Sequence, residues 1–213
     1  IKNMHNDGGS RFVAPSPATL EALTGKDVHK YGTELSHSFT PDAQKPAFSI
    51  YSANLKGAYS DKVKDLVRTF AFIDLGEKDQ PAAAVVYDQL VKKQPDFDTF
   101  WQVTTLVTPE MSGDDLILTS FRQDESLRGK MLLRMVKPAP AKRKLEILSG
   151  KDSLNVFGKI YQAPANRPEA HGSRVMFKSL EKNAAQEFFC TMNLYTQDQS
   201  PLPLKTAESA SCF

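Results

Sequence analysis

The sequence predicts an all-β protein, a large antiparallel multi-stranded β-sandwich, and three observations support this class. Apolar and polar residues alternate in several short segments, as they do in strands buried on one face. Turn-forming sequences separate these segments, which favours an antiparallel sandwich over a βαβ fold. A chain of 213 residues is also long enough for one large all-β domain or two small ones.

The composition of the first 45 residues predicts a loop-rich segment on the surface rather than a separate domain. Residues 1–45 are rich in Gly, Pro, Ser, His and Asn and poor in periodic apolar runs. We expect this loop-rich N-terminal segment to pack on the sandwich, which would span residues 46–213. Residues 17–23, which precede Gly25, predict a short helix with a glycine stop.

The stretch from Val63 to Tyr87 fits two templates. Val63, Leu66 and Phe70 have helical spacing, whereas residues 70–75 are strongly β-prone. An apolar run from Ala82 to Tyr87 follows Pro81 and can serve as a pairing partner. We therefore interpret the stretch as a two-strand hairpin.

Further strands are predicted by alternation in the second half of the chain. The segment 188–195 places Phe188, Cys190, Met192 and Leu194 on one side. The single Trp101 is predicted to be a core residue rather than a sugar-stacking platform. The other predicted strands are residues 131–136, 156–161 and 174–180, and turn signals occupy 112–115, 149–152 and 166–168.

Composition argues against nucleic acid and membranes as partners. The formal net charge is +2, and the densest basic cluster, residues 142–144, is expected to be a solvated turn. The longest apolar run, residues 82–87, is far shorter than the ~20 residues of a membrane-spanning helix. No signal-peptide pattern opens the chain, and its start at Ile1 predicts a processed product or a fragment.

No metal site or catalytic residue is predicted within the chain. The four histidines are not spaced as local metal ligands, and Cys190 and Cys212 could form a single bridge or both stay reduced. Asp114 and Asp115 lie in a turn, where solvation is the expected role rather than glycoside hydrolysis. Residues 6–11 carry paired glycines before Arg11, which suits either a carboxylate or sulfate ligand or a tight turn with a solvated arginine.

The order of several short strings resembles the heparinase II/III-like polysaccharide lyases. The resemblance covers most of the chain and is densest between residues 54 and 107. Its strings are Asn6-Asp7-Gly8-Gly9-Ser10-Arg11, Asn54-Leu55-Lys56-Gly57-Ala58-Tyr59-Ser60, Lys62-Val63 with Arg68-Thr69-Phe70, Val85-Val86-Tyr87-Asp88-Gln89 and Phe100-Trp101-Gln102-Val103.

This resemblance implies a specific place in a larger enzyme. Such lyases have an N-terminal α/α toroid and a C-terminal β-sandwich, and the present chain resembles the sandwich only. They cleave uronic-acid-containing polysaccharides of the heparin, heparan sulfate or alginate type by β-elimination. The resemblance implies that the toroid of the same enzyme and an acidic polysaccharide are the partners, and that the enzyme is periplasmic or secreted.

The resemblance also implies which residues lie near substrate. The catalytic groups come mainly from the toroid, and an H-x-H stretch that binds structural zinc would lie upstream of Ile1, so we expect no cofactor in this chain. Ser10 and Gln89 replace a Gln and an Arg of the family pattern, and Thr104 or Thr105 stands where a His is expected. The substrate-binding candidates are His5, Arg11 and His37.

Two alternative functions stay open at this point. The first is a non-catalytic carbohydrate-binding or structural β-sandwich module without a toroid partner. The second is a protein–protein interaction domain, which has no positive support in the sequence. An exposed apolar patch above ~400 Å² on one sheet face would favour the second.

Overall fold

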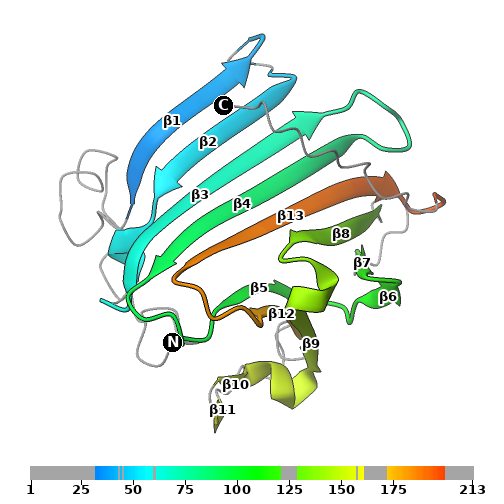
Figure 1. Cartoon of the computed structure of the whole chain (residues 1–213). Coiled ribbons are helices and arrows are strands. Elements are labelled where there is room, and N and C mark those ends of the chain that lie inside the picture. Colours follow the sequence, from blue (N-terminus) through cyan, green and yellow to red (C-terminus); the bar gives the residue numbers. More distant parts are fainter. Residues whose placement is uncertain are drawn as a thin grey trace, which may run out of the picture.

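A computed structural model of the chain, drawn in Figure 1, is built from strands. Among the described residues, no helix is long and apolar enough to cross a membrane, and the helices present are three short 3₁₀ segments: η2 (Lys56–Ala58), η4 (Pro140–Lys142) and η5 (Gly150–Leu154). The structure describes residues 32–42, 44, 46–59, 61–120, 129–156, 158–160 and 172–199. The strands are β1 (Thr33–Thr40), β2 (Phe48–Asn54), β3 (Val63–Asp74), β4 (Ala82–Lys92), β5 (Phe100–Thr105), β6 (Glu110–Ser112), β7 (Asp115–Thr119), β8 (Gly129–Lys137), β9 (Arg143–Ser149), β10 (Asn155–Val156), β11 (Lys159–Ile160), β12 (Ser173–Ser179) and β13 (Ala185–Thr196).

The strands form one large and one small antiparallel sheet, together with a short hairpin of β10 and β11. The large sheet has the order β1-β2-β3-β4-β13-β8-β7-β6, and the small sheet has the order β5-β12-β9. Strand β13 lies between β4 and β8, so the C-terminal half of the described chain returns to the middle of the large sheet. Figure 1 shows the small sheet beside β13 and β8, away from β1 at the other edge. The prediction of an all-β sandwich is confirmed.

The predicted hairpin is present as β3 and β4. The two strands pair from Val63 opposite Lys92 to Asp74 opposite Ala82. The helical spacing at the start of β3 does not produce a helix, because cross-strand pairing with β4, joined from Val67 onward by pairing with β2, satisfies its backbone groups. Gly76, in the connection between the strands, adopts φ +65°, which glycine tolerates without a Cβ clash.

The core lies between the two sheets. Val175 and Phe177 of β12 are fully buried and meet Phe188 and Cys190 of β13. Trp101 belongs to the same cluster and is 6% exposed, which confirms its predicted core role. The remaining buried members are Leu116, Leu133 and Met135, and Val103, Leu118, Leu145, Ile147 and Met192 pack around them.

Part of the N-terminal segment belongs to the sheet. Residues 33–40 form β1, which pairs with β2 from Thr33 opposite Asn54 to Thr40 opposite Phe48. The loop-like composition of residues 1–45 therefore hides an edge strand, whose side chains are exposed along its whole length. An exposed edge strand needs few apolar residues, and Leu35 and Phe39 are the two large apolar residues of β1, so its periodic signal is weak. The helix predicted over residues 17–23 lies outside the described residues.

Two local predictions differ from the structure. Residues 156–161 were expected to form one strand, but β10 and β11 pair with each other in a two-residue ladder around Gly158, which has φ +85°. Asp115 was expected to be solvated in a turn, but it begins β7 and is buried. Its carboxylate accepts two hydrogen bonds from the Arg134 guanidinium, at 2.8 and 2.6 Å.

The basic cluster at residues 142–144 is not a free patch. Lys142 pairs with Glu181 at 2.9 Å, and Lys144 pairs with Glu146 at 2.6 Å. Arg143 points the other way: it lies over the Phe177 ring and donates hydrogen bonds to the backbone carbonyls of Met135 and Pro138. Burial lowers the pKa of this guanidinium. The two lysines are thus solvated, as expected, whereas Arg143 links β9 to the end of β8.

Candidate functional site

One of the three predicted substrate-binding residues can be placed. His5 and Arg11 lie outside the described residues, and His37 lies on β1 with its ring exposed. His37 Nδ1 is 2.6 Å from a carboxylate oxygen of Glu34. Its ring packs against Phe39, with the ring centroids 5.5 Å apart and the planes tilted by 38°. His37 thus marks the start of an aromatic surface.

The large sheet carries exposed aromatic side chains on one face of β1, β2 and β3. Because residues opposite one another in an antiparallel ladder share a face, the register assigns them together. His37 is opposite Tyr51, and Tyr51 is opposite Phe70. Phe39 and Phe72 lie two residues further along their strands and are both opposite Ser49. We call His37, Phe39, Tyr51, Phe70 and Phe72 the aromatic face.

The aromatic face continues the core face of the sandwich beyond the small sheet. The register leads from Phe70 on β3 to Val86 on β4 and then to Cys190 on β13. Along this row the exposed fraction falls from 42% at Phe70 to 8% at Val86 and 0% at Cys190. Phe39, Tyr51 and Phe72 are 45%, 44% and 40% exposed. Within the part of the chain that the structure describes, the small sheet therefore covers the β13 side of this face and leaves the β1–β3 side open.

An ion pair lies at the border between the aromatic face and the core. Arg68 of β3 and Asp88 of β4 are opposite one another, and Arg68 precedes Phe70 by two residues, so both lie on the same face. Arg68 Nε and Nη2 donate to the two Asp88 carboxylate oxygens, both at 2.6 Å. The Asp88 side chain is 6% exposed and that of Arg68 is 40% exposed. Asp88 raises the pKa of Arg68, so the guanidinium stays charged at the edge of the open surface.

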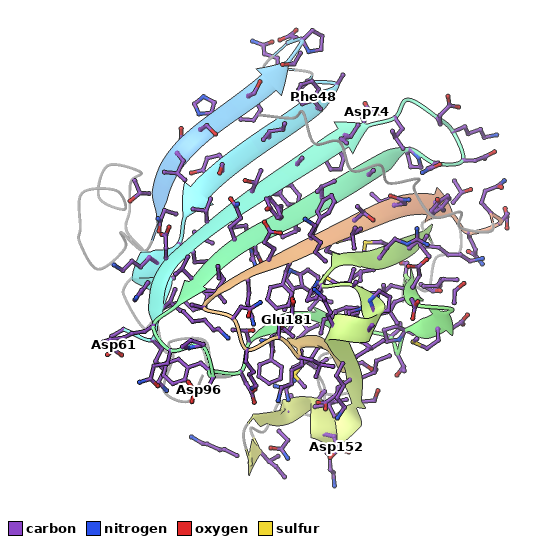
Figure 2. The ribbon with its side chains drawn as sticks, in the orientation of Figure 1. Phe48, Asp61, Asp74, Asp96, Asp152 and Glu181 are labelled. Carbon is purple, nitrogen blue, oxygen red and sulfur yellow. The ribbon has the colours of Figure 1, made fainter. Side chains whose placement is uncertain are left out.

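A second group of charges lies where β4 leaves the sheet, near Asp96 in Figure 2. The buried Lys92 donates to the carbonyl oxygens of Pro95 and Phe97, at 2.7 and 2.9 Å. Desolvation, followed by repulsion from Lys182, lowers the pKa of Lys92. Because its Nζ is held by backbone carbonyls, Lys92 anchors the turn instead of facing a ligand.

The carboxylate of Asp98 links this turn to the small sheet. It pairs with Lys178 at 2.7 Å and with Lys182 at 2.8 Å. Hydrogen bonds from these two lysines lower the pKa of Asp98 to about 2. The group is a structural ion-pair network, in which two lysines share one carboxylate.

Metal and thiol chemistry have no support among the described residues. No group of three or more His, Cys, Asp or Glu side chains in this part of the chain could hold a metal ion. Cys190 is a free and fully buried thiol, and Cys212, its possible bridging partner, lies outside the described residues. Burial raises the pKa of Cys190 to about 12, so the thiolate that a nucleophile requires is not available near neutral pH.

The sequence reasoning named His37 as a candidate and did not single out the other residues of the aromatic face. The spacing Phe70-Ala71-Phe72 was a usable signal, because two aromatic residues separated by one position share one face of a strand. What the sequence did not indicate is that this face is left open. The aromatic face can bind a flat, partly apolar ligand through its rings, and the histidine, the tyrosine hydroxyl and the nearby ion pair provide polar contacts.

Comparisons with known proteins do not identify a family. No protein-family model matches the chain, and no curated protein matches it.

Proposed function

We propose that the chain is the C-terminal β-sandwich of a heparinase II/III-like polysaccharide lyase. The enzyme would act by β-elimination on a uronic-acid-containing polysaccharide of the heparin, heparan sulfate or alginate type, in the periplasm or outside the cell. The sandwich would support the helical toroid and form one wall of the substrate cleft.

The observation that carries this proposal is the Arg68–Asp88 pair. Arg68 belongs to one string that resembles the family, and Asp88 belongs to another, 20 residues further along the chain. The two strings lie on adjacent strands, and their charged residues meet in a bidentate ion pair. Two separate strings that resemble the family thus meet in one ion pair. This is expected if the chain and the family have the same sandwich fold.

The proposal divides the chemistry between two parts of the enzyme. β-Elimination needs a base for the proton α to the carboxylate, a group that neutralises the enolate and an acid for the leaving oxygen. In the proposal these groups come from the toroid and from the stretch before Ile1. The described carboxylates of Asp88 and Asp115 are buried and held by arginines, and the half-exposed Asp98 is held by two lysines, which is consistent with a supporting role.

A non-catalytic carbohydrate-binding module is the second candidate. The open aromatic face favours it, because this surface is complete within the chain and needs no further domain. The two candidates differ in what should precede the sandwich in the gene.

The test combines the gene with an activity assay. We expect the codons before Ile1 to encode about 300 residues of paired amphipathic helices, the size of a large domain. The chain alone, incubated with heparin, heparan sulfate and alginate, should give no absorbance from unsaturated uronate, whereas the enzyme with its helical part should give it. A signal peptide directly before Ile1, or full turnover by the chain alone, would overturn the lyase proposal.

A further inference from the structure

We infer that the aromatic face is a binding surface for a sugar chain, which stacks its pyranose rings on Tyr51, Phe70 and Phe72. This inference concerns a surface wholly within the chain. It holds for a lyase sandwich and for an independent module, so it does not depend on the proposed function.

The arrangement of the rings matches an extended ligand. Tyr51 and Phe70 are direct cross-strand neighbours, with Cβ atoms roughly 4.5–5.5 Å apart in such pairs. Phe70 and Phe72 are two residues apart along β3, a rise of roughly 6.6 Å. The rings therefore form a platform that runs both along and across the strands. A chain of rings with apolar C–H faces can contact several of them at once.

The polar groups around the platform suit hydroxyl groups. A sugar hydroxyl both donates and accepts hydrogen bonds, so it is best matched by a donor and an acceptor side by side. Arg68 lies two residues from Phe70 on the same face, and its pair with the buried Asp88 uses two of the five N–H donors of the guanidinium. An acceptor comes from the exposed carboxylate of Asp74, two residues beyond Phe72 on the same strand. His37, at the outer edge, adds an exposed imidazole beside Tyr51.

The charges near the aromatic face include no excess of positive charge. Arg68 is matched by Asp88, Glu34 contacts His37, and the exposed Asp74 lies two residues beyond Phe72 on the same strand. Such a surface has no positive field to attract an acidic polymer from a distance. We therefore expect stacking and hydroxyl contacts to dominate, with binding that depends little on ionic strength.

The size of the surface favours a sugar chain over a second protein. Phe39, Tyr51, Phe70 and Phe72 are each 40–45% exposed. At roughly 150–250 Å² for each aromatic side chain, they present about 350 Å² together. A stable protein–protein interface buries about 800 Å² on each partner. The aromatic face alone is too small for such an interface, whereas a short oligosaccharide can cover it.

The test is calorimetric titration of the full 213-residue chain with two probes, a guluronate hexasaccharide and cellohexaose. We expect both to bind with affinities within about threefold of each other, and with less than a twofold change between about 50 and 500 mM salt. Phe70→Ala and Tyr51→Ala should each weaken binding about five- to tenfold, since a ring contact contributes about 1 kcal/mol or slightly more.

The matched control is Phe48→Ala. Phe48 lies on β2 like Tyr51, at the start of the strand, where Figure 2 labels it. Because residue numbers 48 and 51 differ by an odd number, the two side chains point to opposite faces of the sheet. A folded Phe48→Ala variant, checked by circular dichroism, should bind as the unaltered chain does. The inference is overturned if neither probe binds, if Phe70→Ala binds unchanged, or if only the acidic probe binds and salt abolishes that binding. Because the lyase proposal is tested by the gene and by turnover, the two can fail independently.

Discussion

The ion pair between Arg68 and Asp88 should be asymmetric in its effect on stability. Asp88 is 6% exposed at the border of the core, whereas Arg68 is 40% exposed. Replacing Arg68 by Met leaves a buried carboxylate without its two charged donors. Replacing Asp88 by Asn leaves an arginine that can turn toward water, and it keeps an acceptor of the same shape in the core.

The magnitudes follow from these exposures. Removing one partner of a fully buried ion pair costs about 3–5 kcal/mol, because an uncompensated charge stays behind. Since Arg68 is partly exposed, water reaches the vacated side of the carboxylate, and we expect Arg68→Met to cost about 2–3 kcal/mol. Asp88→Asn should cost about 1 kcal/mol, the net value of the weakened hydrogen bonds.

Urea unfolding, followed by Trp101 fluorescence, measures both values. Trp101 is the only tryptophan and lies in the core, so its emission reports the loss of the sandwich. The exposed pair Lys93–Asp61, at 3.5 Å, provides the control, and Lys93→Met should change the free energy of unfolding by less than about 0.5 kcal/mol. If Arg68→Met and Asp88→Asn lowered the free energy of unfolding equally, or if Asp88→Asn lowered it more, the reasoning that the carboxylate is the buried partner would be refuted.

Two further predictions concern pH and thiol reactivity. The pKa of Asp98 is lowered to about 2 in the folded chain, below the ~3.9 of an unfolded aspartate, so its two ion pairs stabilise the fold above about pH 4 and lose this effect as the pH falls toward 2. Asp98→Asn should therefore be less stable than the unaltered chain at pH 6, by under about 1 kcal/mol because the pair is half-exposed, and equally stable near pH 2. Thermal unfolding of both proteins across this pH range measures the difference. A difference in stability that grows as the pH falls would contradict the prediction. In a Cys212→Ser variant, the buried Cys190 is the only thiol and should react with an aromatic disulfide reagent only after urea unfolds the chain, so rapid labelling of the native state would contradict its burial.

The interior strands were predictable because their alternation is strong. Val175 and Phe177 lie on one face of β12, as the sequence indicates, and both are fully buried. The hairpin of β3 and β4 was predictable for the same reason, together with the β propensity of its residues. Edge strand β1 was not, since an exposed edge places no demand for apolar residues on its sequence.

Charged residues were harder to interpret than apolar ones. Asp115 and Arg143 occur in sequences typical of solvated turns, yet one is buried in a bidentate pair and the other caps backbone carbonyls beside Phe177. A charge can be buried only where its partner is supplied, and that partner lies on another strand. Local sequence does not contain this information.

Residue order alone decides that this chain forms strands, because a two-residue period of apolar side chains can bury a face only in extended backbone. The same period does not say which strands become neighbours, nor which face is covered. Those outcomes depend on pairings between distant segments, such as β4 with β13, and on the area of the second sheet. Three strands pack over the β13 side of the large sheet, so Cys190 is buried while Phe70, in the same register row, faces solvent.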